Sequence, residues 1–545
     1  MTKYTVTVID TTGKQNYIFK SNRLRENIGA SFLLSQATKS WIEEILEQKF
    51  NVPKGRQEDA IEKSQLNAEI IYANGGNALI IFKSREIAVG FTQILSRKVL
   101  QEAPGIHLLV AHKEFDWNDE SDNNLYGVVE DLKKYDIDYQ KYERMSSVPL
   151  LGLGVTASCN STLLPAVGKS ENYVKYGDEE DADSYLVSTE AKRKLEVVGQ
   201  ANIKLQDIFA DEVDRKIYKF PYRTDHLGRS KGESSYAAVI HVDGNGMGTR
   251  FKNHGRQGKT NRDYINAIRD FSKSVDSAGI NALKAVASIL VKSIQQGKVL
   301  GSLGEFNLNA QYYLPFRPLV YAGDDITFIC EGRIGIELAA LFLREFENQT
   351  VTDGKALTAC AGVCVVKTHY PFARAYAISE ELCKSAKKFV KENKFEDKSF
   401  SALDWHLAAS GLIGSISEIR DREYKIPKNQ DIYDLTMRPV RLQSNSSDWC
   451  TWEGFTQVVR EFKTGKNWEG KHNKVMALRE VLRQASDKAV EEFLRNYSKS
   501  SQLQLPLFPK SSGQNEQLAK NGWLNRRCGY FDAIEAMEFY LGLEG

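Results

Sequence analysis

The chain has 545 residues, of which 42% are apolar and 26% are charged. Its 73 Lys and Arg residues nearly balance its 71 Asp and Glu residues, so the net charge of +2 gives no overall attraction to nucleic acid or anionic membranes. At roughly 100 to 200 residues per domain, this length predicts about three or four domains.

The cysteines indicate a reducing compartment. Seven of them occur without any CxxC pair and mostly inside apolar runs, as expected for thiols in a cytoplasmic protein. Cys360 and Cys364 lie on one face of a predicted strand and lack nearby Cys or His partners, so we predict a core position and no zinc. No apolar run approaches the roughly 18 residues of a membrane span, and no signal peptide is present. We therefore expect no membrane partner.

The first periodic segment, residues 4–10, alternates β-branched residues and ends on Asp10, which predicts a strand. A long helix is predicted from residue 22, because apolar residues recur at helical spacing up to residue 45. Residues 70–72 and 78–82 are short strands around Asn74-Gly75-Gly76-Asn77, a turn typical of a tight hairpin. A helix near residues 87–95 and a strand over 106–110 complete a β-α-β-β-α-β order.

The same order returns in the second half of the chain. A predicted strand over residues 236–243 ends on Asp243 and is followed by a glycine-rich loop. Two runs of apolar residues at helical spacing come next, with Gly279 between them, and predict helices. Strands at 319–321 and 326–329 flank the turn Ala322-Gly323-Asp324-Asp325. A helix, a strand over 357–366 and a helix over 372–390 follow.

Two copies of one βαββαβ unit predict an α+β protein built from two ferredoxin-like domains, with helical regions between and after them. We expect the first domain at 1–116, a helical domain at 117–215, the second domain at 216–410 and a helical C-terminal domain at 411–545. Polar stretches at 117–124 and 170–184 are predicted loops, and 498–517 a linker. The chain is predicted to be irregular just after 411 and to end in a helix around 534–541.

Three carboxylates of the second unit are predicted to meet at one sheet end. The first strand of such a unit pairs beside the hairpin, so Asp243 approaches Asp324 and Asp325. Dense negative charge of this kind favours Mg²⁺ or Mn²⁺, and two such ions about 3.5–4 Å apart catalyse in-line displacement at phosphorus. The predicted catalytic residues are these three aspartates, and Val242 is included in the predicted metal-binding set. The alternative is a solvated acidic turn.

Glycines beside the strand end give a triphosphate room and backbone N–H donors. The predicted nucleotide-binding residues of this unit are Gly244, Asn245, Gly246, Met247, Gly248, Gly323, Lys384 and Lys387. For the two lysines, the exposed face of a helix is an equally simple interpretation.

The first unit keeps Asp10 at its strand end but has Gly75-Gly76-Asn77 where the second has Gly323-Asp324-Asp325. Without the two turn carboxylates it cannot assemble a two-metal cluster. We predict that Gly75, Gly76 and Asn77 bind a nucleotide and that the second unit catalyses. The alternative is that the first unit only packs against the second.

The opening IDTTGKQNYIFKSNRLRENIGASFLLSQ, the YANGGN and YAGDD hairpins, HVDGNGMG and LTMRPVRL together resemble the large subunit of type III CRISPR effector complexes. The resemblance spans nearly the whole chain. It implies two palm domains related to GGDEF and class III nucleotide cyclases, the first degenerate and nucleotide-binding and the second catalytic. It also implies ATP as substrate, cyclic oligoadenylate as product, and CRISPR subunits and guide or target RNA as partners.

The sequence departs from this family in three places. It starts directly at the first palm strand and contains no His-Asp dipeptide, so we expect no DNA cleavage by an HD nuclease domain. Between the palms only Cys159 remains of the family's zinc-binding cysteines, so we expect packing to hold that region. Ala322 stands where the family often has a first glycine in the turn, which we expect to be tolerated.

The leading hypothesis is a metal-dependent nucleotidyltransferase that joins nucleoside triphosphates, ATP first among them, into cyclic or linear oligonucleotide messengers for antiviral defence. The alternative is a largely non-catalytic scaffold subunit of a type III CRISPR ribonucleoprotein. A template-directed polymerase is disfavoured, because the near-neutral chain has no long basic stripe.

Overall fold

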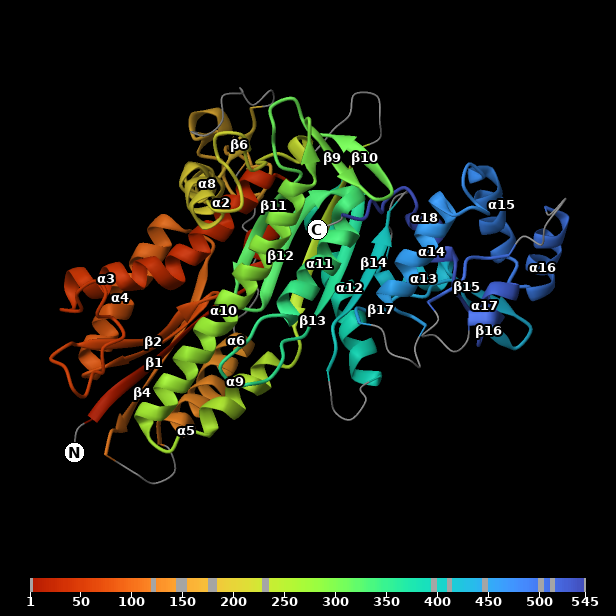
Figure 1. The fold of residues 1–545 in the computed structure, drawn as a ribbon. Coiled ribbons are helices and arrows are strands. Elements are labelled where there is room, and N and C mark those ends of the chain that lie inside the picture. Colours follow the sequence, from red (N-terminus) through yellow and green to blue (C-terminus); the bar gives the residue numbers. More distant parts are fainter. Residues whose placement is uncertain are drawn as a thin grey trace.

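The computed structural model describes residues 3–118, 124–143, 154–174, 184–227, 235–393, 399–408, 414–443, 449–497, 504–509 and 515–543. Two sheets lie side by side, the first built by the N-terminal part of the chain and the second by its middle (Figure 1). The C-terminal helices, blue in Figure 1, lie on the side of the second sheet away from the first. The predicted loop at 117–124 and linker at 498–517 fall largely outside the described residues.

The first unit is a four-stranded antiparallel sheet with the order β2-β3-β1-β4. Its elements are β1 (Lys3–Thr12), α1 (Lys14–Phe19), α2 (Leu24–Ser35), the π-helical η1 (Gln36–Ser40), α3 (Trp41–Lys49), β2 (Ala68–Asn74), β3 (Asn77–Phe82), α4 (Arg85–Glu102) and β4 (His107–Asp116). The long helix predicted from residue 22 is therefore α2 and α3 joined through one π-helical turn.

The second unit repeats this topology in a six-stranded sheet with the order β11-β12-β7-β13-β14-β17. Its elements are β7 (Tyr236–Gly244), α9 (Met247–Arg256), α10 (Asn261–Lys292), β11 (Phe316–Ala322), β12 (Asp325–Glu331), η5 (Gly332–Ile334), α11 (Gly335–Glu347), β13 (Ala359–Lys367) and α12 (Phe372–Glu392). The predicted α+β class and the duplicated βαββαβ unit are confirmed. Both units also carry a register shift at the same place, between Ile70 and Tyr72 in β2 and between Pro318 and Val320 in β11.

Several strands extend the second unit beyond the predicted motif. A small sheet of β8 (Ile294–Gln295), β9 (Lys298–Gly301) and β10 (Gly304–Asn307) is inserted after α10. The main sheet gains β14 (Ala402–Leu407), parallel to β13, and β17 (Val440–Arg441). Because β17 comes from the predicted C-terminal domain, that region contributes to the second sheet. The exact domain boundaries stay a prediction.

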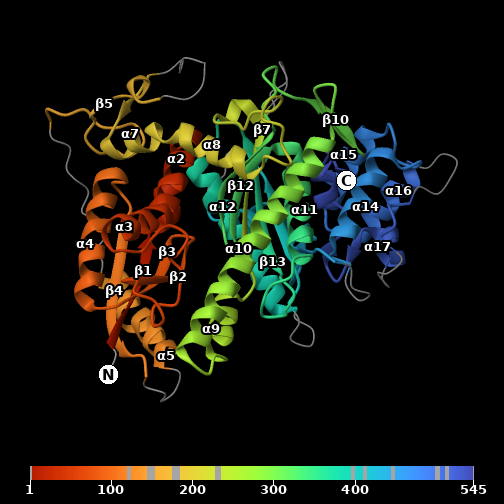
Figure 2. The ribbon, with the colours of Figure 1, turned by 60° about the vertical axis from the view of Figure 1, so that its left-hand side comes forward.

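The helix α10 lies between the two sheets in both views (Figures 1 and 2). The two helical stripes predicted around Gly279 are one continuous helix, begun by a capping box of Thr260 and Asp263. Its length and composition match those of a membrane-crossing helix, but its apolar stripe is buried in the protein core. Arg262 and Arg269 of this helix donate to the fully buried Glu69 of β2, each at 2.6 Å, and so bind it to the first sheet.

Short helices and turns connect the two units. The helices α5 (Asn124–Asp131), η2 (Leu132–Ile137) and α6 (Asp138–Glu143) follow β4, and the first two bury apolar residues against the first sheet. The remaining connectors are β5 (Gly168–Lys169), η3 (Ser170–Asn172), β6 (Leu186–Val187), α7 (Thr189–Glu196), α8 (Val198–Ile208) and η4 (Thr224–Leu227). A Cβ on Gly29 of α2 would lie 1.8 Å from the carbonyl oxygen of Lys194, so α7 touches the backbone of α2.

The C-terminal region is mainly helical. The sequence had predicted an irregular chain after residue 411, but among the described residues regular elements begin at Ile416. Its elements are α13 (Ile416–Glu423), β15 (Lys425–Lys428), β16 (Asp431–Asp434), α14 (Trp452–Thr464), α15 (His472–Leu482), α16 (Asp487–Asn496), α17 (Asn515–Asn521), β18 (Trp523–Leu524), β19 (Arg527–Cys528) and α18 (Phe531–Ala536). The strands pair in the order β15-β16-β19-β18, and the pairing of β16 with β19 joins segments that are distant in sequence. The last helix ends at Ala536, earlier than expected.

The two units share one hydrophobic core. Ile9, Ile18 and Phe19 of the first belong to the same buried cluster as Val239 and Tyr376 of the second. The rings of Phe19 and Tyr376 stack with their centroids 3.8 Å apart. All seven cysteines are buried, as expected for core thiols. The relative position of the two sheet ends is therefore fixed by packing.

Candidate active site

The β-sheet register places equivalent residues of the two units at equivalent positions. In the second unit Asp243 of β7 is paired with Asp325 of β12, directly after the turn at Gly323. In the first unit Asp10 of β1 is paired with Asn77 of β3, directly after the turn at Gly75 and Gly76. The duplication therefore sets a pair of carboxylates at one sheet end and a carboxylate with an amide at the other.

The two turns face each other. A Cβ on Gly75 would lie 3.9 Å from the Cβ of Ala322, which is the contact distance of two methyl groups. Cavities of about 330 Å³ and 510 Å³ open on either side of this contact. Both cavities are lined by Lys14, Asn74, Gly75, Asp276, Ala322 and Asp325. Two ligands therefore have room beside one pair of turns, at the junction of the two units.

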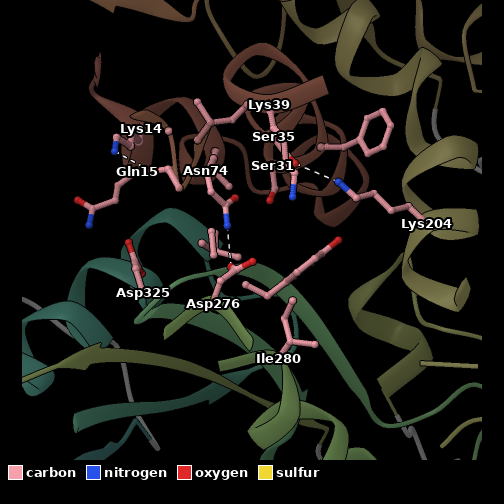
Figure 3. Close-up of a pocket in the computed structure, with 18 of the residues that line it drawn as sticks. Lys14, Gln15, Ser31, Ser35, Lys39, Asn74, Lys204, Asp276, Ile280 and Asp325 are labelled. Atoms are coloured by element: carbon pink, nitrogen blue, oxygen red, sulfur yellow. Dashed lines mark hydrogen bonds between the residues drawn. The ribbon is translucent and has the colours of Figure 1, made fainter. Parts of the chain in front are cut away.

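Asp276 of α10 joins the turns. Its Oδ1 accepts a hydrogen bond from Nδ2 of Asn74 at 2.6 Å (Figure 3). The same oxygen accepts another from the backbone N–H of Gly323 at 3.0 Å. A carboxylate that accepts from both turns fixes their separation. Asp276 was not among the predicted site residues. Its one signal in the sequence is its position directly beside the apolar stripe of α10.

The turn at Gly323 also depends on the absence of a side chain in α10. A Cβ on Gly279 would lie 2.5 Å from the carbonyl oxygen of Gly323, closer than real Cβ contacts. Gly323 itself adopts a left-handed φ of 66°, which favours glycine. The turn can therefore approach α10 closely enough to reach Asp276.

Two acidic residues of the second unit, Asp324 and Asp325, have a raised pKa. Burial and then the charge of Asp243 raise the pKa of Asp324 to about 6. Burial, Asp243 and Asp324, in that order, raise the pKa of Asp325 to about 7, although its side chain is 51% exposed. Asp325 faces the cavity, so the desolvation comes from the walls around it. The site thus holds more negative charge than the protein neutralises.

Two lysines partly offset this charge. Nζ of Lys387 on α12 lies 2.5 Å from Oδ2 of Asp243 and donates to the carbonyl of Gly244 at 3.1 Å. Lys14, after β1, donates to the carbonyl of Gly75 at 2.8 Å, and its charge lowers the pKa of Asp325. The predicted residue Lys387 is therefore at the site, whereas Lys14 was missed because it belongs to the other unit.

Lys384 does not reach the carboxylates. Its side chain is 68% exposed, and Nζ pairs with Glu380 on the same helix at 2.8 Å. For this residue the structure agrees with the alternative interpretation, the exposed face of a helix. Arg250 of α9 does not reach the carboxylates either, because it forms a two-point ion pair with Asp353.

The glycine-rich loop has mixed roles. A Cβ on Gly244 would lie 2.8 Å from Oδ2 of Asp324, so only glycine admits that carboxylate, and Gly248 lines the larger cavity. Gly246 adopts a φ of 67° as the N-cap of α9. The Met247 side chain is in the core, and the Asn245 amide donates to Thr358 and Phe400. These last two side chains shape the loop and do not face the cavities.

The glycine turn of the first unit is held by a hydrogen bond from β1. Gly75 and Gly76 have φ of 63° and 86°, and the carbonyl of Gly76 accepts from Thr11 Oγ1 at 2.6 Å. Gly75 and Asn77 line the larger cavity, and both glycines line the smaller one. All three predicted residues therefore border the space between the units.

The carboxylate oxygens of Asp243, Asp324 and Asp325 are suitable ligands for a divalent cation. Burial and the charge of Asp243 raise the pKa of Asp324 and Asp325, so these carboxylates gain from a bound cation, and oxygen donors suit Mg²⁺ or Mn²⁺. Val242 offers only its backbone carbonyl, since its side chain is buried in the core. In the described part of the chain no group of three His, Cys, Asp or Glu side chains is closed into a metal-binding cluster. Here Asp243 pairs with Lys387 instead.

Replacing Asp276 with alanine should lower the free energy of unfolding by about 1–3 kcal/mol, because the Asn74 amide and the Gly323 N–H both lose their acceptor. Hydrogen exchange at the Gly323 turn should accelerate. Chemical denaturation and exchange mass spectrometry measure the two effects. Asp270→Ala, exposed on the same helix, is the control and should change stability by less than about 0.5 kcal/mol. Equal effects of the two substitutions would contradict the bridging role.

Comparison with known proteins supports the family resemblance. Residues 236–396 match the family described as Cas10/Cmr2, second palm domain. No curated protein matches the chain in sequence. Among solved structures, the Csm1–Csm4 cassette in complex with AMPPNP matches 99% of this chain and 70% of the other, with 14% identity and a TM-score of 0.52. The cassette in complex with cA3 matches 98% and 70%, with 12% identity and a TM-score of 0.52. At these identities the likeness shows the fold.

Proposed function

We propose that this chain, which has the fold and the second palm domain of a Cas10-like large subunit, is a metal-dependent nucleotidyltransferase. It joins nucleoside triphosphates, ATP first among them, into cyclic or linear oligonucleotides for antiviral defence. The observation that carries this proposal is the asymmetry of two facing turns. Both border the same space, but only the Gly323 turn bears paired carboxylates opposite a strand-end aspartate.

The catalytic half is the second palm. Asp243, Asp324 and Asp325 would hold the divalent cations, with the carbonyl of Val242 beside them. Such ions, when bound, lower the pKa of an attacking 3′-hydroxyl and stabilise departing pyrophosphate. Lys387, already at the strand end, supplies positive charge for the triphosphate. The structural relatives in complex with AMPPNP and cA3 support a nucleotide ligand.

The first palm holds the other nucleotide. Its turn lacks the two carboxylates, so it does not activate phosphate, but Gly75 and Gly76 leave room for close approach. In the joining step the 3′-oxygen of one nucleotide bonds to the α-phosphorus of the other. The bond from that phosphorus to its bridging oxygen breaks, pyrophosphate leaves, and the hydroxyl proton passes to solvent. Asp276 keeps the two turns at the separation that this step requires.

The partner we propose is a second protein of a type III CRISPR complex, because the relatives with this fold are solved as Csm1–Csm4 cassettes. The scaffold alternative shares this partner but predicts no synthesis.

Incubating the purified chain with each nucleoside triphosphate and Mg²⁺ or Mn²⁺, with and without RNA and partner subunits, tests the function. Mass spectrometry should find oligonucleotides and an equivalent amount of pyrophosphate in the ATP mixtures, and chelation with EDTA should stop both. Absence of product from every mixture, with the chain still assembling into a complex, would favour the scaffold alternative.

A further inference from the structure

The smaller of the two cavities has a basic end that the joining reaction described above does not use. Near the turns this cavity is lined by Gly75, Gly76 and Asp325. Its other wall carries Lys39 of η1 and Lys204 of α8, with Ser35 of α2 beside them (Figure 3). Two segments that are distant in sequence, the helix of α2 and η1 and the helix α8, therefore bring two ammonium groups and a hydroxyl to one wall.

Neither ammonium group is neutralised by the protein. Among the described residues, no carboxylate lies within salt-bridge distance of Lys39 or Lys204. Nζ of Lys204 donates to Oγ of Ser35 at 3.0 Å and lies over the ring of Phe32 at 5.8 Å. Burial lowers the pKa of Lys204, and the charge of Lys39 lowers it further. The two lysines thus repel each other across a space that an anion would fill favourably.

The nearby acidic groups do not fill this role. Asp276 and Glu43 act on Lys204 only at a distance, and Asp276 already accepts from Asn74 and Gly323. Ser35 accepts from Lys204, so its own hydroxyl proton is available to a ligand oxygen. Ser31, one turn earlier on α2, donates to the carbonyl of Leu319 and is thereby occupied.

The backbone contributes to this arrangement. Lys39 belongs to the single π-helical turn that interrupts the long helix between Ser35 and Trp41. A π-helical turn adds a residue to the turn and re-aims the side chains after it, and such turns are frequent at functional sites. Here the interruption lies where the helix borders the cavity.

We propose that Lys39, Ser35 and Lys204 form an anion subsite that binds the polyphosphate of the nucleotide held by the first palm. The inference rests on the proposed function for the identity of that nucleotide. The subsite supplies positive charge that the glycine turn of the first palm lacks, and it holds the phosphates away from the carboxylates of the second palm. It therefore orients this nucleotide so that its 3′-hydroxyl attacks, and its own α-phosphorus is not attacked.

Calorimetry on the full chain with inorganic tripolyphosphate, ATP and adenosine, all without divalent metal, tests the subsite. In the double variant Lys39→Met, Lys204→Met, affinity for tripolyphosphate and ATP should fall at least about tenfold, while any adenosine binding stays unchanged. Lys98→Met is the matched control, because Lys98 belongs to the same palm, pairs with Glu44 and does not line the cavity. It should bind tripolyphosphate like the unmodified chain.

Ser35→Ala, a smaller change, guards against a double variant that does not fold, and should weaken tripolyphosphate binding about threefold to tenfold. Undiminished tripolyphosphate affinity in the folded variants, or no tripolyphosphate binding by the unmodified chain, would overturn the subsite. Tripolyphosphate binding is measured without any synthesis. The anion subsite and the proposed synthesis can therefore be refuted independently of each other. A chain that binds tripolyphosphate through these residues but makes no oligonucleotide would refute only the proposed synthesis.

Discussion

Replacing both Asp324 and Asp325 with asparagine should reduce oligonucleotide synthesis roughly a thousandfold or more, because it removes the charge that would hold the catalytic cations. The substitution keeps the volume of both side chains. It also removes two negative charges. Burial and the charge of Asp243 raise the pKa of both carboxyl groups, so their ionisation opposes folding. The melting temperature should therefore stay the same or rise while synthesis is lost.

Two measurements separate this result from damage to the fold. Titration with Mn²⁺, followed by electron paramagnetic resonance, should show bound ions in the unmodified chain and not in the double variant. Asp270→Asn, exposed on α10, is the control and should retain both synthesis and Mn²⁺ binding. Retention of synthesis within about tenfold in the double variant would remove these carboxylates from the mechanism.

The second large effect is expected at Gly279, a residue that touches no ligand. In Gly279→Ala the new Cβ would lie 2.5 Å from the carbonyl oxygen of Gly323, so the turn must move away from α10. A misplacement of about 1 Å in a reacting group costs roughly a hundredfold in rate, and we expect a loss of this size. The free energy of unfolding should fall by at most about 2 kcal/mol, because crowding costs about 1–3 kcal/mol and alanine regains about 1 kcal/mol of helix propensity.

Gly127→Ala is the matched control for this substitution. Gly127 is also a helical glycine, in α5, but its Cβ would meet nothing within 4 Å. The control should therefore gain helix propensity and keep full synthesis. Rates measured under saturating ATP, together with melting temperatures, distinguish the two variants. Equal rates for both would show that the approach of α10 to the turn does not position the carboxylates.

The sequence predicted those parts of the site that follow from local patterns. The order of the predicted strands and the turn residues were enough to place Asp243 beside Asp324 and Asp325, because the first strand of a βαββαβ unit pairs beside the hairpin. They did not reveal Asp276, since its two partners are in different hairpins and its own helix belongs to only one of the units. Contacts between units depend on how helices pack, which a local pattern does not encode.

The two lysines of α12 show the same limit. Lys384 and Lys387 are three residues apart and equally suitable by spacing, yet only Lys387 reaches Asp243. Which of them does so depends on the position of α12 along β7, a property of tertiary packing. The three-stranded insertion after α10 and the strands β14 and β17 were missed because they are short or pair with distant segments.

The core that the two palms share gives the first palm a structural role beside any binding role. Phe372, Tyr376 and Ile378 of α12 are buried in a cluster that also contains Ile18 and Phe19 of the first palm. Cutting the chain between the palms would expose these side chains to water, at about 1.5–3 kcal/mol for each large one. Each palm thus depends on the other to keep these side chains out of water, and we expect the two palms to unfold in one transition.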